Sequence, residues 1–83
     1  KYIYYCKMLK NNDIRKPDYA FTEFELDGVN INSLFIFEKE NLLIVDEYFG
    51  FEKTIKCNEK GWTVIKIDKL EENIDLIKRY TNG

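Results

Sequence analysis

The chain has 83 residues, 45% hydrophobic and 34% charged, with a formal net charge of −2 and no histidine. This length favours one small domain over residues 1–83, and the composition excludes an intrinsically disordered chain. The acidic balance gives no positive field for general nucleic-acid binding, which depends on displacing counterions from phosphates. Without histidine, the Ser-His-Asp and Cys-His catalytic systems are excluded.

The sequence also lacks the motifs of cofactor and metal sites. Its glycines stand singly, so it contains no phosphate-binding loop. Cys6 and Cys57 cannot complete a tetrahedral zinc shell without histidine, and we expect both to be free thiols buried in strands of a cytoplasmic protein. The apolar run Leu42–Val45 is far shorter than the roughly 20 residues that span a bilayer. We therefore expect no cofactor, no metal, no membrane and no small-molecule substrate.

One carboxylate pair has the spacing of a possible catalytic or metal site. Glu23 and Glu25 alternate, so on a strand they project from the same face, as a glycosidase or metal site requires. We favour a solvent-facing strand instead, because so small a domain has little room for an enclosed active site. Ser33, the only serine, is expected to be a small residue in a half-buried strand. The sequence therefore predicts no enzyme and no catalytic residue.

The first half of the chain predicts three strands. Residues 2–9 are aromatic and rich in strand-forming residues, and residues 11–13 end that segment. Residues 19–26 form the next strand, with a phase change that indicates either a bulge or a strand covered on both faces. Asp27-Gly28 then predicts a type I′ two-residue hairpin into the strand that follows.

The second half predicts three more strands and a helix. Strands are expected over residues 42–48, 54–57 and 62–67, with short turns between them. Asp68 and Glu71 then resemble a capping box, and an apolar stripe continues to Tyr80. The predicted fold is α+β: an antiparallel β-meander of about five to six strands with one C-terminal helix packed on one face.

The segment after the run Leu42–Val45 is the candidate binding site. It places three aromatic rings around Gly50, and three rings cannot all turn inward there, so at least one should be exposed. Exposed aromatics beside charges are typical of protein-binding hot spots. The alternative is that Phe49 or Phe51 closes the end of the core. The candidate partner-binding residues, called the aromatic corner below, are Asp46, Glu47, Tyr48, Phe49 and Phe51.

These features favour a small non-catalytic inhibitor that blocks the functional surface of another protein. Toxin-immunity proteins and phage anti-defence proteins such as anti-CRISPRs have this general build, and the expected partner is a toxin or a defence nuclease complex. The alternative is a nucleic-acid-binding β-module or a regulatory subunit. We expect direct nucleic-acid binding to be unfavourable, because acidic residues lie among the basic residues that would contact phosphates. The basic residues in question are Lys7, Lys10, Arg15, Lys16, Lys53, Lys56, Lys60 and Lys66.

Overall fold

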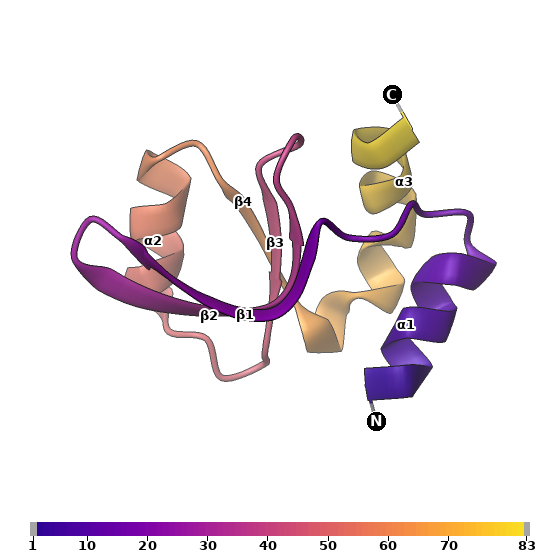
Figure 1. The fold of residues 1–83 in the computed structure, drawn as a ribbon, viewed down its shortest axis with the longest axis horizontal. Helices are drawn as coiled ribbons and strands as arrows, with labels where there is room; N and C mark the ends of the chain where they lie inside the picture. The colour runs from indigo at the N-terminus through magenta and orange to yellow at the C-terminus, as the bar shows by residue number, and fades with distance from the viewer. Residues whose placement is uncertain (1, 83) are drawn as a thin grey trace.

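A four-stranded mixed sheet with helices on its two faces forms the fold (Figure 1). The computed structural model describes residues 2–82. The α+β class is confirmed, but the predicted meander with a single helix is wrong. In chain order the elements are α1 (Tyr2–Asn11), β1 (Tyr19–Leu26), β2 (Val29–Phe37), β3 (Leu42–Val45), α2 (Phe51–Glu59), β4 (Thr63–Lys66), the 3₁₀ turns η1 (Ile67–Lys69) and η2 (Glu71–Asn73), and α3 (Ile74–Asn82).

The strands lie in the order β1-β2-β3-β4, and the last pair departs from the prediction. β1, β2 and β3 are antiparallel neighbours, whereas β4 runs parallel to β3, with Leu42 opposite Thr63. Parallel neighbours cannot be joined by a tight turn, because the chain must return to the starting end of the sheet. α2 makes that return (Figure 1).

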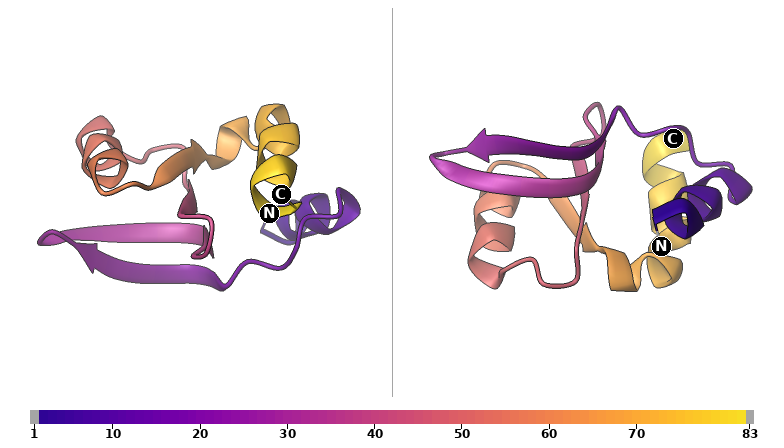
Figure 2. Two further views of the ribbon diagram at one scale, coloured as in Figure 1. Left: turned by 90° about the horizontal axis from the view of Figure 1, so that it is seen from above. Right: turned by 60° about the horizontal axis from the view of Figure 1, so that its bottom comes forward.

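The sheet separates two hydrophobic clusters. One cluster is covered by α1 and α3, which supply Leu9 and Ile77, and the other includes Cys57 of α2. Figures 1 and 2 show α2 at one end of the molecule and the α1–α3 pair at the other. β3 serves both clusters, since its alternate residues point to opposite faces. Leu42 and Ile44 belong to the first cluster, and Leu43 and Val45 belong to the second.

The first segment is a helix rather than the predicted strand. Leu9 is buried, and Tyr5 and Met8 pack against the same cluster, which is the spacing of one helical face. The predicted break after it is confirmed, because Asp13 has φ 59° and Ile14 N–H donates to Leu9 O at 3.0 Å. This is the Schellman ending of a helix. Packing of that apolar face outweighs the strand propensity of the tyrosines.

The predicted strand over residues 54–57 is also helical and lies within α2. Thr54 N–H donates to Gly50 O at 3.0 Å, and Cys57 is the fully buried residue of this helix. The turn after it was predicted correctly, since Gly61 has φ 87° and Trp62 N–H donates to Cys57 O at 2.9 Å. A parallel neighbour for β3 requires this crossover, so tertiary topology decides the segment.

The predicted phase change in β1 is present, but it is not a bulge. Phe21 has φ 53°, while the register stays continuous from Ala20 opposite Phe35 to Thr22 opposite Ser33, so no residue is inserted. Phe21 therefore reverses which side chains face each side of the sheet without shifting the pairing. Ser33 is buried as expected, and its hydroxyl donates to Thr22 O at 2.9 Å.

The predicted hairpin turn and the predicted helix cap differ in outcome. Asp27 and Gly28 have φ 54° and 79°, which confirms the type I′ hairpin. The capping box is wrong, because two 3₁₀ turns without side-chain caps precede α3, whose first residue is Ile74. The predicted apolar stripe is nevertheless buried at Leu70 and Ile77. Burial therefore follows the apolar spacing even where the helix is irregular.

The two cysteines should differ in reactivity. Both are free, but Cys6 is exposed on α1 rather than buried in a strand, whereas Cys57 is fully buried in α2. Burial also raises the pKa of the Cys57 thiol, which reduces its reactive thiolate fraction. We expect iodoacetamide to label the folded protein once, at Cys6, and to label Cys57 only in denaturant, as counted by mass spectrometry. Equal labelling of both thiols in the folded state would contradict this assignment.

Candidate protein-binding surface

The aromatic corner is held in one conformation by its own aspartate. Tyr48 N–H donates to Asp46 Oδ1 at 2.8 Å, and Phe49 N–H donates to Asp46 O at 3.2 Å. A side-chain acceptor of this kind stabilises the tight turn that leads out of β3. Gly50, with extended backbone, then precedes the first residue of α2, Phe51.

Two of the three rings of the corner are exposed and one is buried. Tyr48 is 85% exposed and Phe51 is 77% exposed, whereas Phe49 is 7% exposed and belongs to the cluster beneath α2. The prediction that at least one ring is exposed is thus confirmed. Phe49 cannot be a contact residue in this conformation. Its buried ring instead fixes the backbone between the two exposed rings.

Sequence reasoning missed one apolar residue of this surface. Ile55 is 41% exposed and lies four residues after Phe51 on α2, so the two side chains share a helical face. The strand prediction for residues 54–57 hid this spacing. If residues 51–59 are taken as a helix, the four-residue spacing from Phe51 to Ile55 places both side chains on one face. The corner surface, as used below, consists of Tyr48, Phe51 and Ile55.

Acidic side chains border the corner surface. Asp46, Glu47 and Glu52 are exposed, and none of them forms an ion pair within residues 2–82. These three carboxylates therefore have no direct ion-pair partner in the described part of the chain, although Lys53 and Lys56 lie on the same helix as Glu52. An apolar surface with unpaired carboxylates is complementary to a partner that combines an apolar recess with basic residues.

The carboxylate pair of β1 lies on an exposed face of the strand. Glu23 and Glu25 are exposed, and their cross-strand neighbours are Asn32 and Asn30. Within the described part of the chain, no group of three His, Cys, Asp or Glu side chains is placed to hold a metal ion. The pair thus lies on a solvent-facing strand.

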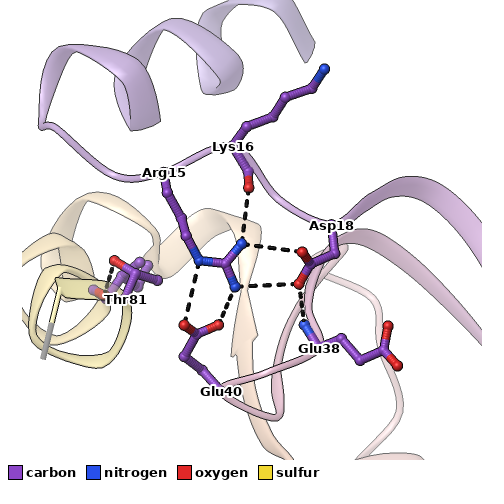
Figure 3. Close-up of polar contacts among 7 residues, drawn as sticks. Arg15, Lys16, Asp18, Glu38, Glu40 and Thr81 are labelled. Carbon is purple, nitrogen blue, oxygen red and sulfur yellow. Dashed lines mark hydrogen bonds and ion pairs between the residues drawn. The ribbon is translucent and has the colours of Figure 1, made fainter.

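One of the candidate basic residues is committed to a structural network (Figure 3). The Arg15 guanidinium donates to Asp18 Oδ1 at 3.2 Å and to both carboxylate oxygens of Glu40, and it lies 5.3 Å from the centroid of the Phe37 ring. Asp18 Oδ2 in turn accepts the Glu38 N–H at 2.7 Å. The network fastens the segment after α1 to the turn between β2 and β3.

The basic residues are accordingly less available for phosphate binding than their number suggests. Arg15 is held by two carboxylates, and Lys60 Nζ lies 3.3 Å from Asp27 Oδ2. Lys10, Lys16 and Arg15 line a cavity of about 510 Å³, but Asp18 lines it as well. Two of the eight candidate basic residues are therefore already paired with carboxylates.

Comparison with protein-family models, with curated proteins and with solved structures gives no significant match. No helix within residues 2–82 has the length and apolar character needed to cross a bilayer. Function is therefore inferred from the geometry of the exposed surfaces.

We expect the Arg15–Asp18 contact to weaken in acid. Hydrogen bonding from Arg15, and then from the Glu38 N–H, lowers the pKa of the Asp18 carboxyl below its ordinary value. A carboxyl with a lower pKa in the folded state stabilises the fold above its unfolded pKa of about 3.9, and this contribution is lost as the pH falls through the folded value. The free energy of unfolding should therefore fall more steeply below about pH 4 in the wild type than in Asp18→Asn.

Urea titrations at several pH values measure this difference. Asp68→Asn is the matched control, because Asp68 is an exposed aspartate outside the network. Its pH profile should parallel the wild type. Coincident profiles for Asp18→Asn and the wild type would show that the ionised Asp18 carboxylate does not stabilise the fold.

Proposed function

We propose that the chain is a non-catalytic protein-binding inhibitor that uses the corner surface to block a functional surface of its partner. The observation that carries the proposal is the near-complete exposure of Tyr48 and Phe51, at 85% and 77%, on a turn whose backbone is fixed. Tyrosine is enriched among binding hot spots, and aromatic side chains with few rotatable bonds lose little entropy on binding.

The charges around the corner indicate the kind of partner. Asp46, Glu47 and Glu52 favour a basic surface and would speed its approach through long-range attraction. Toxic nucleases and defence nuclease complexes carry such surfaces, because they bind phosphate backbones. An immunity-like protein or a phage anti-defence protein of the anti-CRISPR kind, acting in the cytoplasm, is the specific form of inhibitor that we propose.

Alanine substitution separates contact residues from core residues. Tyr48→Ala and Phe51→Ala should each weaken partner binding by about 2–4 kcal/mol and change folding stability by less than about 1 kcal/mol, because both rings are exposed. Phe49→Ala should instead cost about 3–5 kcal/mol of stability, since its ring is buried. Co-purification from the source cell identifies the partner, and calorimetry and thermal melting then measure affinity and stability.

Tyr4→Ala is the matched control for the corner variants. Tyr4 is 58% exposed on α1, at the other end of the molecule (Figure 1), and its truncation should leave partner affinity unchanged. The proposal is wrong if the captured partner binds Tyr48→Ala and Phe51→Ala as tightly as the wild type. It is also wrong if Tyr4→Ala weakens binding as much as they do.

The alternative function, nucleic-acid binding, predicts a different result. With a net charge of −2 and with Arg15 and Lys60 in ion pairs, we expect affinity for single- or double-stranded DNA at about 150 mM salt to be no tighter than about 10⁻⁴ M. Fluorescence anisotropy with labelled oligonucleotides measures it. A submicromolar complex that weakens steeply with salt would favour the nucleic-acid module over the inhibitor.

A further inference from the structure

The outer edge of the sheet is a second surface, separate from the corner. β1 is the first strand in the sheet order, and within residues 2–82 it pairs with β2 alone. In both views of Figure 2 no helix covers the far side of β1. The strand has 8 residues and contains neither proline nor lysine, two residues that commonly protect sheet edges from pairing.

The hairpin turn determines which backbone groups of β1 are free. In a two-residue hairpin the flanking pair, here Leu26 and Val29, exchanges both of its hydrogen bonds, and bonded pairs then alternate along the ladder. Glu23 and Glu25 occupy the intervening positions, so their N–H and C=O groups point toward the open edge. An added strand pairs with groups of this kind.

One face beside this edge favours apolar side chains. A groove of about 270 Å³ lies on this face of the sheet, lined by residues of β1, by Ile36 and Glu38, and by Trp62. Its walls include Tyr19, which is 51% exposed, and Phe24, whose ring centroid lies 6.1 Å from that of Trp62. Between Thr22 and Leu26, where β1 alternates regularly, every second side chain of an added strand would point to this face. Apolar residues at those positions would pack beside Thr22 and Phe24, which line the groove.

The other face favours basic side chains. Glu23 and Glu25 are exposed there, and neither forms an ion pair in the part of the chain that the structure describes. Their cross-strand neighbours Asn32 and Asn30 carry no charge. Opposite charges on adjacent strands stabilise the pair, whereas like charges destabilise it. A second copy of β1 would bring glutamates beside glutamates, so self-pairing is disfavoured.

We propose that β1 accepts an extended segment of another protein as a fifth strand, with lysine or arginine alternating with apolar side chains. The basic residues would lie beside Glu23 and Glu25, and the apolar residues would lie on the opposite face beside Thr22 and Phe24, which line the groove. Backbone pairing supplies the affinity, and the alternation supplies the specificity. This surface does not depend on the function proposed for the corner.

The test uses a fluorescein-labelled octapeptide of alternating lysine and valine, with an amidated C-terminus, and the purified chain. Fluorescence anisotropy should show saturable binding. Two further peptides are N-methylated at every valine or at every lysine, which removes the backbone donors along one side of the strand. At least one of them should bind more than about tenfold more weakly. Equal binding of all three peptides would show simple charge attraction and would overturn the proposal.

Variants of the chain locate the binding edge. The double substitution Glu23→Lys/Glu25→Lys should weaken peptide binding at least about tenfold, because it replaces attraction with repulsion. Glu71→Lys/Glu72→Lys makes the same charge change on η2, and its affinity for the peptide should stay within about twofold of the wild type. The peptide affinity of Tyr48→Ala/Phe51→Ala, at the corner, should also stay within about twofold. Equal weakening by the η2 variant, absence of peptide binding, or concentration-dependent dimerisation that excludes the peptide would each overturn the proposal.

Discussion

The fold depends on a strand that is buried on both faces. Leu42, Leu43, Ile44 and Val45 are all fully inaccessible, and they alternate between the cluster under α1 and α3 and the cluster under α2. A strand covered on both sides cannot show a polar face, which explains its unbroken apolar sequence. Because both cores share β3, loss of packing on one face would loosen the support for the other.

The parallel pairing of β3 and β4 explains where the candidate surface lies. The chain leaves β3, crosses through α2 and returns to the same end of the sheet (Figure 1). The corner is the start of this crossover, and Phe49 anchors it in the core while Tyr48 and Phe51 extend into solvent. The exposed rings are therefore a product of the topology, held in place by one buried ring and one aspartate hydrogen bond.

Local signals in the sequence were reliable where the chemistry of one or two residues fixes the backbone. Asp27-Gly28 adopts the positive φ angles of the hairpin, and Gly61 ends α2 with φ 87°. The exposure of part of the corner also followed from crowding around Gly50. Propensity failed for α1 and α2, because tyrosines and β-branched residues fit either a strand or a helix, and tertiary contacts choose between them. The missed helix also hid Ile55 as a neighbour of Phe51.

The sequence by itself determined the α+β class, the main reversals, the apolar residues of β3 and the presence of exposed aromatic side chains in the corner. These features depend on the tolerance of Asp and Gly for positive φ and on the burial of apolar side chains, both of which act over a few neighbouring residues. Only the tertiary structure decided that β4 runs parallel to β3, that Phe49 is the buried ring and that Arg15 is committed to Asp18 and Glu40. Each of these outcomes depends on contacts between residues distant in sequence, which local patterning does not encode.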